Sequence, residues 1–576
     1  MKLPIIIAMS FVAILSVVMF NLWNLSYDDY NATYNIAKKK KAFSILCSPQ
    51  YIPGVNNEMM PLEGWGTYSW QITTTSDSAQ YYFNQGINMY YGFHIVESRA
   101  SFEKAITFDP DCAMAWWGKA LALGPNINDF VYQAPIDAYP SAIKAKQLIS
   151  QVSPLEQALI SAMAIRYSSD STGDQTKMNG MYKENMSMVY KQYMNNADVA
   201  SIYADALLLL HPWDLYDYKS QPKPWTLEIV KTVQHALKIN PNHPGANHYY
   251  IHSVEGSSHP ADAMKSAELL ALLMPGVAHI VHMPSHIFIR TGYYAKGMTV
   301  NDDAVEAYSS YLQAYPDVEQ GMALYSLHAM HMKANCAQMA GNYDQAMAAS
   351  KALKAAIPVE YLGLPGSMGN YVQYMYHTML FTQIRFGKWD ELLNASVTDT
   401  LVYAPVLQHF ARGLALSRKG DAFSAKRELQ LMQEKMKNPD LKAVWATFSP
   451  AYNDALVGEH LLNGAIAECE HKLPLAIAYY KKAVAAEDSI VYNEPRDWLL
   501  PARQYLGSAL LKAKKQMEAE AVFKKDLVIN PNNGWSLTGL KKIYQSTKNV
   551  QALKALNHRL RDAWLVKDTK VNNPVF

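Results

Sequence analysis

Residues 82–86 read Tyr-Phe-Asn-Gln-Gly, and residues 101–110 read Ser-Phe-Glu-Lys-Ala-Ile-Thr-Phe-Asp-Pro. Apolar and small residues recur in these stretches at the period of an α-helix. Gly86 lets two helices approach closely, and Phe102 is placed to pack between them. Pro110 then stops the second helix, because proline cannot continue one. This region predicts a pair of antiparallel helices joined by a short turn.

The same pattern recurs along most of the chain. Proline stops follow helical stretches at Pro241 and Pro531, and helices are separated by turns at residues 292–294, 341–343, 387–389 and 420–422. A small or apolar residue opens each second helix, with spacings of 34, 49, 46, 33, 51 and 43 residues: Ala263, Gly297, Ala346, Leu392, Ala425, Ala476 and Ala519. Two of these spacings lie close to a 34-residue repeat, so the others need longer helices or inserted loops.

These units resemble the tetratricopeptide repeat (TPR) over most of residues 78–565. The resemblance implies an all-α, TPR-like α-solenoid, a right-handed superhelix of antiparallel helix pairs, in which each pair buries its apolar side against its neighbours. One concave face, lined mainly by the first helix of each pair, is expected.

The chain is also similar to a group of bacterial exported TPR proteins. The segments that carry this second resemblance are residues 83–86, 91–94, 111–118, 124–126, 248–252, 282–286 and 493–498. It implies the same fold and export from the cytoplasm, and it carries no activity with it.

The N-terminus predicts targeting to the cell envelope. An uncharged, mostly apolar run follows Lys2 and covers residues 3–23, which is long enough to span a bilayer. We expect a signal-anchor, or else a cleaved signal peptide, at 1–23 and a tether and entry segment at 24–77. Repeats should follow at 78–240 (N-terminal), 241–395 (central, histidine-rich) and 396–576 (C-terminal). This organisation places the protein on the periplasmic side, either anchored in the membrane or secreted after cleavage.

The composition argues against several classes of function. Net charge is +2 and charged residues make up 18% of the chain, so no nucleic-acid partner is expected. There is no Gly-rich phosphate loop and no dinucleotide fingerprint. The four cysteines are far apart, which excludes a thiolate zinc site of the C-x-x-C type.

Histidines are concentrated in the central repeats. Nine of the seventeen lie between His243 and His331. Counted on the repeat, the groove-facing positions of four successive first helices carry eight histidines and one glutamate. They are His248, His252, Glu255, His279, His282, His286, His328, His331 and His377. Neutral imidazole is the commonest protein metal ligand, so all of these except His377 are predicted to hold a transition metal: copper, zinc or iron.

Pro284 interrupts the central histidine helix. Either the helix begins there, which would put His279 and His282 on a loop, or it kinks there. Asn301 and Asp302 are candidate partners for the second nitrogen of a ligating histidine. His377, Trp498 and Arg503 are further candidates for contacts in the groove.

Two functions follow from this pattern. The first is a groove with a histidine-rich metal site, in a metalloenzyme or a metal-handling protein. A zincin-type protease is disfavoured, because Tyr249 stands where H-E-x-x-H needs its glutamate. The alternative is a TPR scaffold without metal or catalysis, whose groove binds a peptide, protein or small-molecule ligand.

Overall fold

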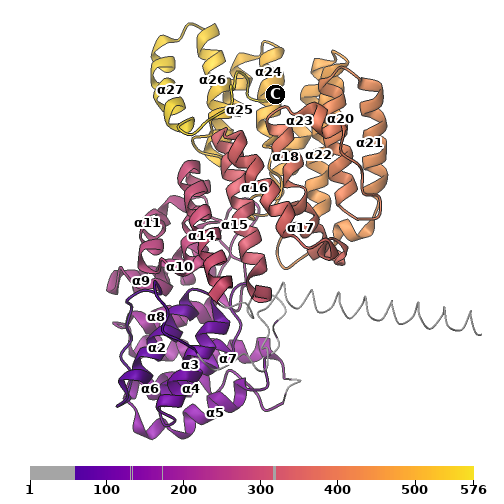
Figure 1. Cartoon of the computed structure of the whole chain (residues 1–576). Helices are drawn as coiled ribbons and strands as arrows, with labels where there is room; N and C mark the ends of the chain where they lie inside the picture. The colour runs from indigo at the N-terminus through magenta and orange to yellow at the C-terminus, as the bar shows by residue number, and fades with distance from the viewer. Residues whose placement is uncertain (1–58, 130–131, 133, 171–172, 315–318) are drawn as a thin grey trace, which may run out of the picture.

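The computed structural model describes residues 59–129, 132, 134–170, 173–314 and 319–576. Within these ranges the chain is helical apart from its turns and loops and one isolated bridge between Tyr216 and Pro222. Figure 1 shows the helices stacked from the indigo N-terminal repeats at the bottom to the yellow C-terminal repeats at the top. The all-α, TPR-like repeat architecture predicted from the sequence is confirmed for this part of the chain.

The helices of the N-terminal repeats are α2 (Asp77–Tyr91), α3 (Ile95–Phe108), α4 (Ala113–Ala122), α5 (Ala138–Gln147), α6 (Pro154–Met163), α7 (Gln175–Gln192), α8 (Ala197–Leu208) and α9 (Thr226–Ile239). Those of the central repeats are α10 (Pro244–Val254), α11 (Met264–Leu273), α12 (Ala278–His282), α13 (Pro284–Thr291), α14 (Tyr294–Ala314), α15 (Glu319–Ala340), α16 (Tyr343–Ala356), α17 (Gly366–Tyr376), α18 (Thr378–Arg385) and α19 (Trp389–Leu393).

The helices of the C-terminal repeats are α20 (Ala404–Arg418), α21 (Ala422–Lys435), α22 (Ala451–Cys469), α23 (Leu473–Glu487), α24 (Ala502–Lys512), α25 (Gln516–Ile529), α26 (Gly534–Ser546) and α27 (Val550–Ala563). In the described part of the chain, short 3-10 turns join helices at Ile149–Gln151, Pro260–Ala263, Val359–Gly363 and Pro439–Lys442.

Glycine and aromatic residues hold the helix pairs together as the sequence predicted. The ring of Phe102 lies between Gly86 and Gly118, where an added Cβ would come within 2.8 Å and 2.4 Å of it. Phe523 fills the same place between Gly507 and Gly539. A side chain larger than hydrogen at these positions would push neighbouring helices apart.

The turns between paired helices also follow the sequence. Gly292, Gly341, Gly387 and Gly420 all have positive φ, between 68° and 90°. L-residues with a side chain rarely adopt that conformation, so glycine ends the first helix cleanly in these four pairs.

The long spacings between repeats have identifiable causes. The 49-residue step from Gly297 to Ala346 contains α14 and α15, which have 21 and 22 residues. The 51-residue step from Ala425 to Ala476 contains a 3-10 turn at Pro439–Lys442 and the 19-residue helix α22. The repeat is therefore lengthened within the helices and loops while the pairing of helices is kept.

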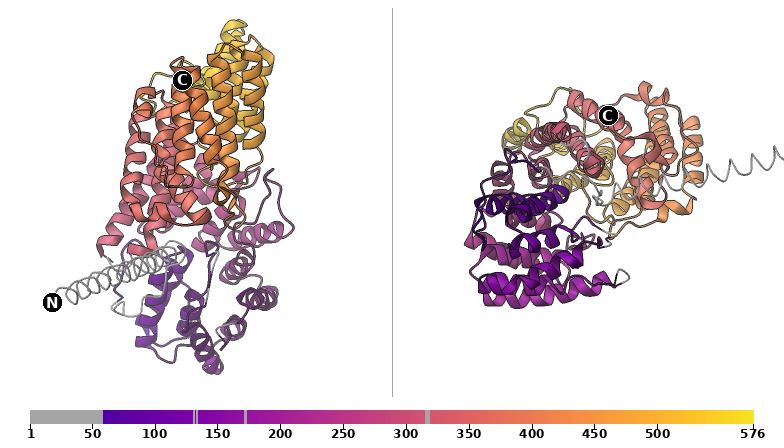
Figure 2. Two further views of the ribbon diagram at one scale, coloured as in Figure 1. Left: turned by 90° about the vertical axis from the view of Figure 1, so that its right-hand side faces the viewer. Right: turned by 60° about the horizontal axis from the view of Figure 1, so that its bottom comes forward.

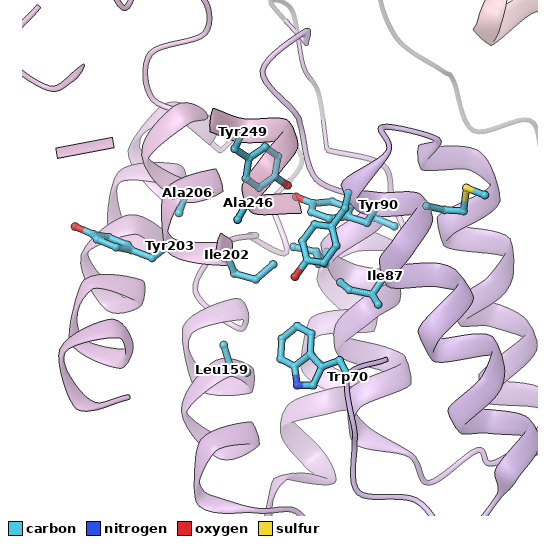
Figure 3. Packing of buried hydrophobic residues seen from close by; sticks show 14 of the residues in the cluster. Trp70, Ile87, Tyr90, Leu159, Ile202, Tyr203, Ala206, Ala246 and Tyr249 are labelled. Carbon is cyan, nitrogen blue, oxygen red and sulfur yellow. The ribbon is translucent and has the colours of Figure 1, made fainter. Parts of the chain in front are cut away.

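The apolar core runs through successive pairs without a break between the N-terminal and central repeats. One cluster of buried residues extends from Met59 to Phe288. Figure 3 shows part of it, where Ile87 and Tyr90 of α2 lie with Leu159 of α6, Ile202 of α8 and Tyr249 of α10. The histidine-bearing helices α10, α12 and α13 therefore pack against the N-terminal repeats.

The C-terminal repeats lie beside the central ones (Figure 2). Trp535 of α26 donates a hydrogen bond from Nε1 to the carbonyl of Gln338 in α15, at 3.0 Å. The Tyr294 hydroxyl donates to the carbonyl of Pro531 at 2.9 Å, and Asn342 Nδ2 donates to the carbonyl of Val566 at 2.6 Å. These contacts link segments about 200 residues apart, so the array curves back on itself.

No helix among the described residues is long and apolar enough to cross a membrane. The apolar segment predicted at 3–23 lies outside the described residues.

Candidate metal centre

Six histidines from four helices meet in the interior of the central repeats. We call them the histidine centre: His248 and His252 from α10, His279 and His282 from α12, His286 from α13 and His328 from α15. In one triplet, His248, His252 and His279, a ligand atom from each residue lies within 4.8 Å of those of the others. A second triplet, His282, His286 and His328, meets the same criterion.

The two triplets are adjacent. The ring centroids of His252 and His286 are 5.8 Å apart, and those of His279 and His282 are 6.1 Å apart. Glu255, the residue that ends α10, forms a third set of ligand atoms within 4.8 Å together with His252 and His286. The spacings of four residues within α10 and of three and seven along α12 and α13 do place these side chains on one face.

The helix kinks at Pro284. α12 ends at His282, and α13 begins at Pro284 with Met283 between them in helical conformation (φ −51°, ψ −37°). The Met283 N–H still donates to the carbonyl of His279 at 3.1 Å. His279 and His282 are therefore helical, and of the two readings of Pro284 the kink is the one observed.

Hydrogen bonds at Nδ1 orient the imidazoles. His248 Nδ1 lies 2.6 Å from the carbonyl oxygen of Tyr91, and His282 Nδ1 lies 2.6 Å from Asn301 Oδ1. His252 Nδ1 lies 2.9 Å from Glu255 Oε1. Because each partner is an acceptor, the proton sits on Nδ1 and the lone pair of Nε2 faces the centre.

Several nitrogens of the centre are left without partners among the described residues. Nε2 of His248 and of His252 is buried and makes no hydrogen bond, and neither does either nitrogen of His279. His282 Nε2 and His286 Nε2 are 2.7 Å apart, a distance that needs a hydrogen between them. Buried polar atoms are normally satisfied, so a set of lone pairs converging on one place calls for an explanation.

Glu494 is a member of the site that the sequence reading missed. Its Oε2 lies 2.7 Å from His286 Nδ1, and Glu255 Oε2 lies 2.5 Å from the same nitrogen. The Tyr492 hydroxyl donates to Glu494 at 2.9 Å. Glu494 follows α23, more than 200 residues from His286, so no helical spacing relates it to the histidines. The one available signal was the segment 493–498 that carries the second family resemblance.

Burial and charge set the protonation of the centre. Burial lowers the pKa of His248, His279, His282 and His328 well below the usual value, and it lowers the pKa of His252 to about 3. His286 is the exception. Burial alone would lower its pKa, but the charges of Glu494 and Glu255 outweigh burial and raise it to about 10. Five imidazoles are thus neutral near pH 7, the form that binds metal.

Five of the six histidines of the centre are buried and His328 is partly exposed, so the centre is more enclosed than the open groove expected from the sequence. His248, His252, His279, His282 and His286 are all at most 3% exposed. Phe93 stacks on His252 and His279, and Trp213, from the segment between α8 and α9, lies edge-on to His252 with centroids 5.3 Å apart. Loops between helices fill the space that a regular repeat array leaves open.

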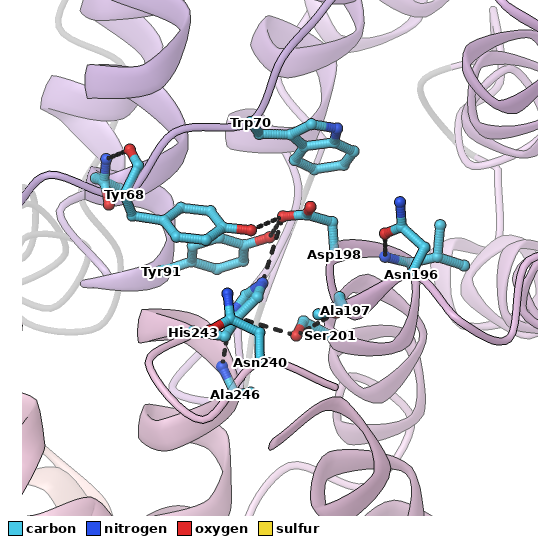
Figure 4. Close-up of polar contacts among 12 residues, drawn as sticks. Tyr68, Trp70, Tyr91, Asn196, Ala197, Asp198, Ser201, Asn240, His243 and Ala246 are labelled. Atoms are coloured by element: carbon cyan, nitrogen blue, oxygen red, sulfur yellow. Dashed lines mark hydrogen bonds and ion pairs between the residues drawn. The ribbon is translucent and has the colours of Figure 1, made fainter. Parts of the chain in front are cut away.

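A neighbouring network holds the start of α10 in place (Figure 4). His243 caps this helix by accepting from the Ala246 N–H at Nδ1, 3.1 Å away, while its Nε2 lies 3.3 Å from Asp198 Oδ1. Tyr68 and Tyr91 also contact Asp198 through their hydroxyls. The side chain of His243 is therefore occupied by structural hydrogen bonds and lies outside both triplets.

The other predicted site residues divide into two groups. Asn301 contacts the centre directly through His282. The others lie outside the triplets. His331 packs on Tyr374, with centroids 5.1 Å apart, and Asp302 pairs with Lys333 at the surface.

The remaining candidates have partners of their own. His377 lies between the carbonyl of Gln373 and Gln408, at 2.8 Å and 3.0 Å, because α17 ends there and turns its ring away. Trp498 packs against Phe381 and Phe410, and Arg503 pairs with Asp488. Counting on the repeat misplaced His377, because a 3-10 turn at Val359–Gly363 precedes α17.

Comparisons with known proteins do not identify a family. No family model matches the chain, and no curated protein does. Among solved structures, a human IFIT1 dimer with m7Gppp-AAAA overlaps 92% of this chain and 100% of its own at 13% identity, with a TM-score of 0.29. The APC/C hetero-tetramer Cut9-Hcn1 overlaps 86% of this chain and 74% of its own at 12% identity, with a TM-score of 0.25. Scores this low carry no argument about function, so the repeat assignment rests on the helix pairs themselves.

Proposed function

We propose that the protein binds transition-metal ions at the histidine centre. The observation that carries this proposal is the buried, unpartnered Nε2 of His248 and His252, whose lone pairs face the centre because Nδ1 is held by an acceptor. Leaving such atoms unsatisfied costs about 1–3 kcal/mol each. A metal ion bound by these nitrogens offsets that cost.

One ion fits the triplet of His248, His252 and His279, whose imidazoles are neutral. A second fits the triplet of His282, His286 and His328 once His286 gives up its Nε2 proton. Imidazole suits copper, zinc and iron, and no cysteine lies in the groups of candidate ligands. The acceptors at Nδ1 would fix the direction in which each Nε2 points. They are Glu255 for His252, Glu494 for His286 and Asn301 for His282.

Three imidazoles per ion leave a coordination position for a water or an exogenous ligand. Structural zinc sites are usually closed by four protein ligands, whereas catalytic sites keep one position open. The arrangement therefore supports a metalloenzyme or a metal-handling protein over a purely structural site.

Metal analysis of the full chain, produced without a histidine tag and exposed in turn to zinc, copper and iron, tests the proposal. We expect stoichiometric metal in the wild type and loss of at least one ion in both His252→Ala and His282→Ala. His377→Ala is the matched control, since it removes a buried histidine whose two nitrogens already have partners. A wild type without bound metal, or equal metal in all four proteins, would contradict the proposal.

The second candidate function is a TPR-like scaffold that binds a partner without metal. It is supported by the helix-pair architecture and by a large recess between the loop after α10 and the segments on either side of α24. Arg290, Asp488 and Arg503 are among the residues that line it. A metal-free wild type in the analysis above would favour this scaffold function.

The proposal includes location in the cell envelope, supported by the apolar run at 3–23 and by the resemblance to exported bacterial TPR proteins. Fractionation of cells that express the full chain is the test. We expect the protein in the envelope fraction, and in the cytoplasm when residues 3–23 are deleted. Cytoplasmic wild-type protein would contradict this location.

A further inference from the structure

A second recess lies apart from the histidine triplets, between α17, α22 and the segment that precedes α24. It has a volume of about 430 Å³, counting the part open to solvent. Its lining is made of tyrosine, tryptophan, phenylalanine, asparagine, aspartate, serine and alanine, and it contains no lysine, arginine or histidine.

Four buried oxygens of this recess have no hydrogen-bond partner among the described residues. They are Asn370 Oδ1, Tyr403 Oη, Asp454 Oδ1 and Asp497 Oδ2. Asn370 already donates through Nδ2 to the carbonyl of Asp440, and Asp497 Oδ1 already accepts from Asn493 Nδ2 at 2.7 Å. Asn370 Oδ1 and the carboxylate oxygens of Asp454 and Asp497 accept hydrogen bonds, so these three atoms lack a donor. The Tyr403 hydroxyl can either donate or accept.

The recess also lacks a positively charged side chain that could pair with its aspartates. Asp454 and Asp497 are 5% and 7% exposed, and neither makes an ion pair within the described part of the chain. Burial raises the pKa of both, and for Asp454 the charge of Asp497 raises it further. A buried carboxyl group without a cationic partner is held in its neutral form, and a bound cation would favour the ionised form.

Aromatic rings form the rest of the wall. Trp445 lies between Tyr371 and Phe448, with centroids 5.8 Å and 6.0 Å away. The faces of such rings attract cations, and this attraction is strongest for tryptophan. Acceptor oxygens and aromatic rings in one recess suit a charged head on an apolar stem.

We propose that this recess binds the primary ammonium group of an alkylamine. An ammonium has three donors and no acceptor, so it can donate to the unpartnered oxygens of Asn370, Asp454 and Asp497. A divalent metal fits less well, because the two aspartates belong to none of the groups of three metal-ligating residues found among the described residues. This inference is independent of the histidine centre.

Calorimetric titration of the full chain with n-butylammonium chloride tests the site. We expect saturable binding by the wild type, at least tenfold weaker binding by Asp454→Asn, and no saturable binding of n-butanol or sodium butyrate. Asp390→Asn is the matched control, because Asp390 is an exposed carboxylate paired with Lys419, and it should bind as the wild type does.

A second variant separates loss of the site from loss of the fold. Tyr403→Phe removes one acceptor and no charge, and it should weaken binding severalfold with helical content unchanged. A lysine-containing peptide titrated beside the free amine distinguishes a peptide side chain from a small metabolite as the source of the ammonium. The proposal is overturned if n-butylammonium does not saturate the wild type, if Asp454→Asn binds it equally well, or if n-butanol binds as tightly.

Discussion

Three imidazoles of the histidine centre, His248, His252 and His282, are directed by an acceptor at Nδ1. Asn301 is the acceptor whose role departs most from the repeat pattern. In other helix pairs the same position holds an aromatic residue that packs between helices, as at Phe102 and Phe523. Asn301 also donates through Nδ2 to the carbonyl of Gly297 at 2.7 Å, which fixes its own orientation. The amide therefore acts as a positioning group for His282.

Replacing Asn301 by leucine is expected to weaken metal binding about 10- to 100-fold, the usual effect of losing such a contact. Competition titration against a chromophoric chelator measures the change. Asp302→Asn, one residue away and exposed, should leave the affinity unchanged. Equal affinity in Asn301→Leu and the wild type would show that this contact does not orient a ligand.

The buried aspartates of the second recess predict a pH dependence of stability. The pKa of Asp497 is raised to about 7 by burial, above the value of about 3.9 for an unfolded chain. The folded state therefore holds the proton more tightly, and the stability this provides is lost as pH rises from about 4 to about 7.

Urea midpoints at pH 4.5 and 7.5 should accordingly differ less in Asp497→Asn than in the wild type. The variant should recover on the order of 1–3 kcal/mol at the higher pH. Asp390→Asn serves as the control for loss of a surface charge. A variant with the same pH dependence as the wild type would rule out this role for Asp497.

At the scale of the element, helix pairing depends on positions where no side chain fits. A Cβ added to Gly507 would lie 2.4 Å from the ring of Phe523, whereas one added to Gly180 in α7 meets nothing within 4 Å. Both residues lie within helices, so replacing each by alanine changes helix propensity in the same way. A difference in stability between the two variants then reports the packing against Phe523.

Gly507→Ala is expected to destabilise the protein by about 1–3 kcal/mol because it overpacks the contact with Phe523. Gly180→Ala should instead stabilise it by about 0.5–1 kcal/mol, since alanine favours the helix. Thermal unfolding followed by circular dichroism gives both values. Shifts of the same sign in the two variants would contradict the packing argument.

At the scale of the whole molecule, the last repeat packs against the central repeats. Trp564, at the end of α27, lies against Gly534 and against Gly341 in the turn between α15 and α16. Its ring meets Trp535 edge-on, with centroids 5.6 Å apart. This contact closes the curve that brings the C-terminal repeats beside the central ones.

Trp564→Ala is expected to cost up to about 3 kcal/mol, the lower end of the range for a buried tryptophan, because this side chain is only partly buried. We expect the C-terminal repeats to become sensitive to limited proteolysis at lower temperature than in the wild type. Leu565→Ala is the control, because that side chain is 74% exposed. Unchanged proteolysis in Trp564→Ala would mean that the repeats are held by other contacts.

The sequence by itself determined the helix pairs, their glycine turns and the set of histidines on successive helices. Each of these depends on residues within about ten positions of one another, so helical periodicity and turn preference are sufficient to find them. The choice between a break and a kink at Pro284 needed the structure, because it depends on what the helix packs against.

Only the tertiary structure decided that Glu494 lies against His286 and that Trp213 covers His252. It also decided that Asp454 and Asp497 share a recess. Each of these contacts joins residues from different repeats through a curved array, and the curvature depends on helix lengths and loops that vary along the chain. For the same physical reason His331 and His377, which local periodicity placed in the groove, lie outside the triplets.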